Sequence, residues 1–151
     1  MSRTPFLAIA LIAGFVPTIA ADDTFPVDRL VAIGDQLQHF GFGHVTELEA
    51  ESANRATAEG WRHPEWHSEL TWSIETGQGL KEELEYGIDA PWGIAPTDIR
   101  HLVDWMTRAD KPARIESLEI DRDGTVELEG EDHQGESRTW RARLEAFHDR
   151  R

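Results

Sequence analysis

The chain twice changes its hydrophobic period from helical to alternating, and this change limits what it can fold into. In the first case, apolar residues recur at Leu30, Ile33, Leu37 and Phe40, which places them on one face of a helix. Two glycines just after Phe40 are expected to end that helix. The next residues alternate between apolar and polar types, which is typical of half-buried strands.

The same order returns in the second half of the chain. Thr97 follows a proline and is the expected N-cap of a second helix. The apolar residues of this helix are Ile99, Leu102, Val103 and Met106. Alternation then resumes, so a helix is again followed by strands.

The two alternating stretches can be aligned with each other. Residues 44–51 match residues 113–121, and a second match follows without a gap. This second match pairs residues 70–88 with residues 126–144. The alignment superimposes the expected inward-facing positions, which are Leu70, Trp72, Leu84, Tyr86 and Ile88 in the first stretch and Val126, Leu128, Trp140, Ala142 and Leu144 in the second.

These patterns predict an α+β fold, built as a tandem repeat of one helix followed by a three-stranded antiparallel sheet (αβββ-αβββ). Unit 1 would span residues 22–95 and unit 2 residues 96–151. In unit 2, Asp123-Gly124 predicts a tight hairpin between the first two strands. In unit 1 the same junction carries an insertion, residues 52–65.

The end of the first unit resembles a known family. Ile88, Asp89, Ala90 and Gly93 occupy the positions of a pattern that typically closes the PepSY domain, namely Val-Asp-Ala, two variable residues and Gly. The resemblance extends to both units, although no glycine follows Leu144 in the second. It implies a small exported protein that acts as an inhibitory or regulatory binding module, as PepSY domains of protease propeptides are thought to act. It transfers no catalytic residue to this chain.

Residues 1–21 have the pattern of a signal peptide. Arg3 precedes a short apolar run, residues 6–16, and small residues follow, so cleavage after Ala20 or Ala21 is expected. The run is shorter than the about 20 apolar residues of a membrane-spanning helix. We therefore expect a periplasmic or secreted protein with no stable membrane insertion after cleavage.

The chain is strongly acidic. Its formal charge is -14, and loss of the predicted signal peptide, whose one charged residue is Arg3, would leave -15. Such a charge repels phosphate backbones and anionic lipid surfaces, so no nucleic-acid partner is expected. A basic partner or cations would complement the charge, and solubility alone is the other interpretation.

The sequence contains no motif that indicates catalysis. It has no cysteine and no serine in a Gly-x-Ser-x-Gly motif. Residues 119–130 share part of the pattern of a calcium-binding loop. Gly130, however, stands where that loop needs a glutamate, and the flanking alternation favours an Asp-Gly hairpin. We therefore expect neither an enzyme nor a cofactor.

Residues 60–72 concentrate three tryptophans and two histidines. His63 and His67 have the four-residue spacing of zinc ligands on a helix. Pro64 and the alternation that follows it favour a strand instead, on which the two side chains would lie about 13 Å apart. A metal site at His63 and His67 is therefore the alternative prediction.

Long loops on a rigid scaffold often hold binding residues, and aromatic side chains make good anchors at interfaces. Trp61, His63 and Trp66 at the end of the insertion, with Trp92 from the linker, are therefore the predicted partner-binding surface. The other interpretation is that these rings cap a thin core.

The predicted function is an exported, non-enzymatic PepSY-like module that binds an unidentified protein and modulates or inhibits a protease or an envelope protein. A periplasmic metal-binding or small-ligand-binding protein is the alternative.

Overall fold

The computed structural model describes residues 23–87, 89–108 and 110–147, and the predicted signal peptide lies outside them. The described chain is mainly β, with one large antiparallel sheet of eight strands and two short α-helices. The strands are β1 (Phe25–Pro26), β2 (His44–Ser52), β3 (Arg55–His63), β4 (Trp66–Ser73), β5 (Gly79–Tyr86), β6 (Arg114–Ile120), β7 (Thr125–Glu131) and β8 (Ser137–Arg143). The helices are α1 (Arg29–His39) and α2 (Ile99–Met106), and the short 3-10 helices are η2 (Pro96–Asp98) and η3 (Leu144–Phe147).

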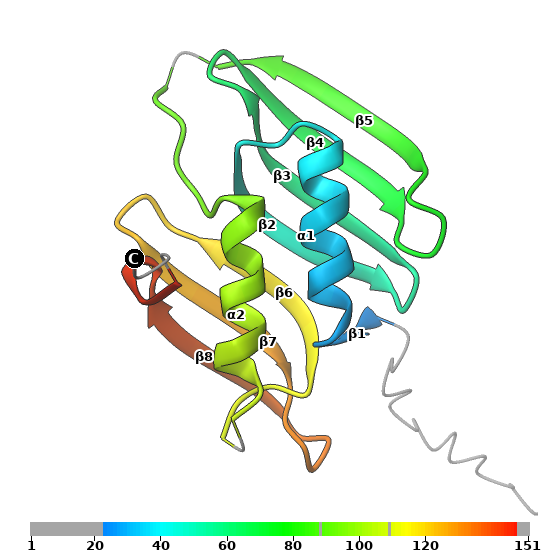
Figure 1. Cartoon of the computed structure of the whole chain (residues 1–151), viewed down its shortest axis with the longest axis vertical. Coiled ribbons are helices and arrows are strands. Elements are labelled where there is room, and N and C mark those ends of the chain that lie inside the picture. The colour runs from blue at the N-terminus through cyan, green and yellow to red at the C-terminus, as the bar shows by residue number, and fades with distance from the viewer. Residues whose placement is uncertain (1–22, 88, 109, 148–151) are drawn as a thin grey trace, which may run out of the picture.

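The sheet is a single layer that runs through both halves of the chain. Its strand order is β5-β4-β3-β2-β6-β7-β8, and the two-residue strand β1 also pairs with β6. At its centre β2 pairs antiparallel with β6, and Leu48 lies opposite Leu118. Figure 1 shows α1 and α2 side by side on one face of this sheet. We call the opposite face, which neither α-helix covers, the open face.

The predicted α+β tandem repeat (αβββ-αβββ) is wrong. The chain forms one mainly β layer, and α1 is followed by four strands before α2 begins. The additional strand is β3, which lies within residues 52–65, the segment predicted to be an inserted loop. Its inward-facing positions are Ala56, Ala58 and Gly60, all of them buried. Because these residues are small, the segment lacks the strong apolar alternation that identifies a strand from sequence.

Both predicted helices are confirmed, and they meet closely above the sheet. The backbone N–H groups of Gly41 and Phe42 bond to the carbonyls of Gln38 and Leu37, which closes α1 in the manner of a Schellman motif. A Cβ added to Gly34 of α1 would lie 2.9 Å from the carbonyl oxygen of Pro96, so this glycine permits the close approach. The prediction that Thr97 caps α2 is wrong, because Thr97 lies inside η2 and Asp98 occupies the N-cap position.

The core fills the space between the two helices and the sheet. Trp72 of β4 is fully buried there, together with Phe25, Leu48 and Leu118. The Trp72 indole donates a hydrogen bond of 2.8 Å to the side-chain oxygen of Gln36, whose amide group donates to the Ile74 carbonyl at 2.8 Å. Because Gln36 belongs to α1, this pair of bonds fixes the helix over β4.

The burial predicted for Leu84 and Tyr86 of β5 is wrong, although both lie on the helix-bearing side of the sheet, opposite Ser68 and Trp66. Ile88, the third inward position predicted in this stretch, lies outside the described residues. Leu84 and Tyr86 are 55% and 60% exposed, whereas Leu70 and Trp72 on the neighbouring strand β4 are buried as predicted. β5 is an edge strand, and neither α-helix lies over it (Figure 1). The alternation of β5 is therefore present, but its apolar side chains have no layer to pack against.

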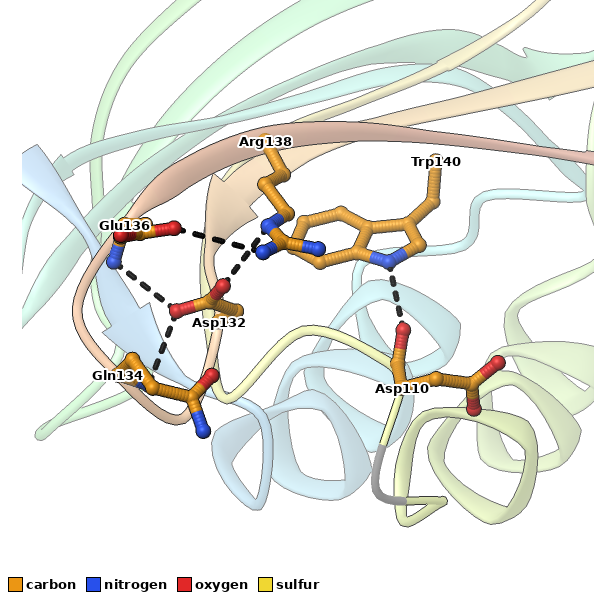
Figure 2. A network of polar contacts seen from close by, with 6 residues as sticks. All are labelled: Asp110, Asp132, Gln134, Glu136, Arg138 and Trp140. Carbon is orange, nitrogen blue, oxygen red and sulfur yellow. Dashed lines mark hydrogen bonds and ion pairs between the residues drawn. The ribbon is translucent and has the colours of Figure 1, made fainter.

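The turn between β7 and β8 is held by one carboxylate (Figure 2). Asp132 accepts hydrogen bonds from the backbone N–H groups of Glu136 at 3.0 Å and Gln134 at 2.9 Å, and it pairs with Arg138 at 2.8 Å. The bond from Glu136, then that from Gln134 and the charge of Arg138, hold the pKa of Asp132 below its ordinary value. Nearby, the Trp140 indole donates to the Asp110 carbonyl at 2.9 Å.

We predict that Asp132→Asn lowers the melting temperature at neutral pH. The pKa of Asp132 is lower in the folded than in the unfolded state, so its stabilisation is present above the unfolded value and is lost as the pH falls through the folded value. The difference between wild type and variant should therefore shrink in acid. Thermal melts at several pH values measure it. Glu136→Gln, which changes an exposed partner of Arg138, is the control and should have little effect. A pH-independent difference would contradict the assignment.

Two glycines allow bulged strands to pass close to their neighbours. The register shifts between Val45 and Glu47 on β2, and a Cβ added to Gly60 of β3 would lie 2.1 Å from the His44 carbonyl oxygen. The same arrangement occurs between β6 and β7, where a Cβ on Gly130 would lie 2.0 Å from the Arg114 carbonyl oxygen.

We predict that Gly60→Ala lowers the free energy of unfolding by about 2 kcal/mol or more, because the backbone that its Cβ would meet cannot move without breaking the ladder. Gly79→Ala is the matched control. Its nearest contacts would be 3.7 Å from Leu70 and 3.8 Å from Phe40, so it should be nearly neutral. Urea denaturation of both variants measures the difference, and equal values would disprove the close approach.

Candidate binding surface on the open face

The open face of the sheet is lined mainly by acidic side chains. Each strand alternates, so the residues that do not face the helices project from the open face. Those on β2, β6 and β7 include Glu47, Glu49, Glu119, Glu127 and Glu129. Acidic residues on β3, β4 and β5 extend this surface toward the β5 edge.

Six of these acids form a row that crosses six adjacent strands. The cross-strand pairs are Glu83 with Glu69, Glu69 with Glu59, Glu59 with Glu47, Glu47 with Glu119, and Glu119 with Glu127. We call Glu83, Glu69, Glu59, Glu47, Glu119 and Glu127 the glutamate row. Directly opposite side chains have Cβ atoms about 4.5–5.5 Å apart, and like charges in this position are destabilising.

Only the two ends of the row are neutralised by ion pairs within the described residues. Glu83 pairs with Lys81 at 2.8 Å, and Glu127 pairs with Arg141 at 2.7 Å. The four inner glutamates form no ion pair with a described residue. Burial raises the pKa of Glu47, and the neighbouring carboxylates, first Glu59 and then Glu119, raise it further. Burial and the neighbouring carboxylates therefore act together against the ionisation of Glu47.

A β-bulge sets the register of this row. Val45 lies opposite Gly60, and after the register shift Glu47 lies opposite Glu59. Without the extra residue in β2, Thr46 would oppose Glu59, and Glu47 would lie on the other face. The bulge that Gly60 permits therefore also brings Glu47 into the row.

An aromatic cluster of Trp61, His67 and Trp92 lies beside the row. The ring centroids of Trp61 and His67 are 5.2 Å apart, and those of Trp61 and Trp92 are 5.8 Å apart. The Trp61 ring packs so closely against Gly87 that a Cβ there would lie 2.3 Å from it. The cluster therefore attaches the linker that follows β5 to the open face.

An arginine from the β6–β7 turn covers this cluster. The Arg122 guanidinium lies 4.3 Å from the centroid of the Trp92 ring and pairs with Asp89 at 2.7 Å. A groove of about 370 Å³ lies between this group and the row, and its wall includes Glu47, Glu59 and Glu119. Asp121 and Arg122 also line the groove, so four carboxylates and one arginine leave it with a net negative charge, which suits a further cationic side chain.

The structure separates the four predicted partner-binding residues. It brings Trp61 and Trp92 together, but Trp61 is only 4% exposed and offers little surface to a partner. Trp66 lies on the helix-bearing side, where its ring is 5.7 Å from that of Tyr86. His63 is exposed at the end of β3 and contributes to a different groove.

The residues of the alternative metal prediction also lie apart. His67 pairs across the ladder with Trp61 and joins the aromatic cluster, while His63 is opposite Trp66 beyond a bulge. No group of three or more His, Asp or Glu side chains suited to a metal ion occurs within residues 23–87, 89–108 and 110–147.

The glutamate row was not predicted from the sequence. Each of its members occupies a solvent-facing position of an alternating strand, which is the only signal that the sequence carries. Recognising the row needs the register of five strand pairs, including a bulge.

No protein-family model matches the chain, and no curated protein matches it at a significant level of sequence similarity. Neither α1, with 11 residues, nor α2, with 8, has the length or hydropathy of a bilayer-spanning helix, and this holds for every helix in the described part of the chain.

We predict that Glu47→Gln raises the free energy of unfolding by about 0.5–1 kcal/mol at neutral pH, because it removes two directly opposed like charges, with Glu59 and Glu119. The pKa of Glu47 is raised in the folded state, so the gain should disappear as the pH falls below the ordinary carboxyl value, where Glu47 is protonated in both states.

Denaturant titrations at pH 7 and pH 4 measure this gain. Glu49→Gln is the matched control on the same strand and face, because it lies opposite Thr57 and Ser117, and it should gain less. Added salt should reduce the gain from Glu47→Gln through screening. Equal gains for the two variants would show that pairing in the row is not the cause.

Proposed function

We propose that the protein is a non-enzymatic binding module that holds a basic surface of a partner protein on the open face of its sheet. The observation that carries this proposal is the glutamate row. Its inner members oppose one another without ion pairs within the described residues, on a sheet face that no α-helix covers.

The arrangement of the acids supports binding over solubility alone. Each directly opposed like-charge pair costs about 0.2–1 kcal/mol relative to neutral neighbours. Acids scattered over the surface would provide the same net charge at a lower cost. Lysine or arginine side chains of a partner would relieve the repulsion on binding. The repulsion that destabilises the free protein would therefore favour formation of the complex.

The aromatic cluster supplies a second element of recognition. Trp92 is half-buried and lines the groove together with Glu47 and Glu59. Because Arg122 already lies over the Trp92 ring, a basic side chain of a partner would enter beside this stacked pair and contact the carboxylates of Glu47 and Glu59.

The proposal agrees with the function expected from the PepSY resemblance. An exported module of that kind would modulate or inhibit a protease or an envelope protein, and a basic patch on that partner would face the glutamate row. No specific observation favours the alternative metal-binding function, because His63 and His67 lie in different surroundings.

We predict that a synthetic lysine-rich peptide of about 20 residues binds the protein and that binding depends on the row. The variant Glu47→Gln, Glu59→Gln, Glu119→Gln should weaken binding at least tenfold in fluorescence anisotropy titrations. The matched control is Glu65→Gln, Glu75→Gln, Asp104→Asn. It changes the net charge equally but alters exposed residues of two turns and α2, so it should bind within about twofold of wild type.

Raising the salt concentration from 50 to 300 mM NaCl should weaken peptide binding by the wild type more than peptide binding by the row variant. An equal loss in the row variant and in the control would mean that net charge alone attracts the peptide, and the proposal would then fail.

A further inference from the structure

The β5 edge of the sheet carries the largest exposed apolar side chains of the described chain. Leu80, Leu84 and Tyr86 are 52%, 55% and 60% exposed, and Trp66 on the adjacent strand is 43% exposed. Trp66 lies opposite Tyr86, so these rings share the helix-bearing side of β5. Neither α-helix reaches that side (Figure 1).

The register of β5 shows which backbone groups face the open edge. The N–H of Gly87 donates to the Glu65 carbonyl, and hydrogen-bonded pairs alternate along an antiparallel ladder. Lys81, Glu83 and Glu85 therefore direct their backbone groups to β4. The backbone groups of Glu82, Leu84 and Tyr86 point outward, where no strand pairs with them.

An apolar groove runs along the same side of β5. It has a volume of about 350 Å³ and is lined by Phe40, Gly41, Arg62, His63, Trp66 and Leu84. Arg62 holds its wall together by donating to the Phe40 carbonyl at 2.8 Å and pairing with Glu82. Because Arg62 neutralises Glu82, the helix-bearing side of β5 presents mainly apolar surface.

The other side of β5 is acidic and continues the open face. Glu83 is the first member of the glutamate row, and Glu85 lies opposite His67. These charges oppose a second copy of the chain at this edge. A two-fold antiparallel pairing centred on Leu84, the middle of the three outward-facing residues, would place Glu83 opposite Glu85 on both sides of the axis, and like charges so placed repel.

We infer that β5 accepts an extended segment of the partner as an additional strand. The segment would alternate apolar residues, which enter the groove beside Leu84 and Tyr86, with basic residues, which face Glu83 and Glu85. Backbone hydrogen bonds at Glu82, Leu84 and Tyr86 would supply affinity, and the two sides of the strand would supply specificity. This inference rests on the proposed function, since it specifies the chemistry of the same basic partner.

Amide hydrogen exchange tests the geometry directly. In the free protein, the amides of Glu82, Leu84 and Tyr86 should exchange faster than those of Glu83 and Glu85. The probe is a nine-residue peptide of alternating lysine and valine. Its addition should slow the exchange of these three faster amides, the fast set, at least tenfold. If the fast set stays fast at saturating peptide, strand addition is wrong.

Two further peptides separate this inference from the proposed function. One has the same composition with all lysines preceding all valines, and the other is the alternating peptide with N-methyl groups on alternate residues along one edge. The alternating peptide should bind at least tenfold more tightly than either. If all three bind equally and the triple glutamine variant of the row weakens them equally, the proposed function stands and strand addition fails. If none binds, both fail.

Variants at one position complete the test. Leu84→Pro removes an outward N–H, which an edge strand tolerates, and should weaken binding of the alternating peptide at least tenfold. Leu84→Ala keeps that N–H and should weaken binding about threefold, and thermal melts of both variants report any loss of folding. Equal binding by the two variants would contradict the inference. A concentration-dependent dimer of wild type in sedimentation, abolished by Leu84→Pro, would assign the edge to a second copy and overturn it.

Discussion

The pairing of β2 with β6 is the contact on which the architecture depends. It joins strands that follow α1 to strands that follow α2, with Leu48 opposite Leu118 in the core and Glu47 opposite Glu119 on the open face. Above it, Gly34 lets α1 approach Pro96 at the start of η2. Without this pairing, the two halves would have separate sheets, and no row of carboxylates could cross the molecule.

The placement of both α-helices on one face divides the chemistry of the sheet. Apolar side chains collect beneath α1 and α2, whereas the open face must be polar because it meets water. The helices are too few to cover the width of the sheet, so β5 keeps apolar side chains without a cover. The acidic face and the apolar edge thus have a common origin in two short helices laid over a sheet wider than they can cover.

The sequence predicts those elements whose signals are local. The period of α1, the stop at Gly41 and the Asp123-Gly124 hairpin need only neighbouring residues, and each is present in the structure. The burial of Leu70 and Trp72 follows from simple alternation.

The remaining features depend on distant parts of the chain. β3 was missed because small residues at its inward positions suit a close neighbour, the bulged strand β2, and that neighbour is not visible in a local pattern. Leu84 lies on the predicted side of the sheet but is exposed, because alternation does not reveal where a covering layer ends. Trp61 was predicted at a surface, but Gly87 and Trp92 cover it. The glutamate row requires correct pairing of six strands, so no single segment encodes it.

The spacing of the glutamate row has a consequence for the solvent around it. Carboxylates repeat at the distance between strands, about 4.8 Å, so the four inner glutamates form a line of charge about 14 Å long. A line of charge this dense concentrates monovalent cations from solution beside the inner glutamates, much as a nucleic acid does on a larger scale. A basic partner that displaces these ions returns them to bulk solvent. The driving force at this face would then be largely the entropy of counterion release, with the enthalpy of new ion pairs as the smaller part.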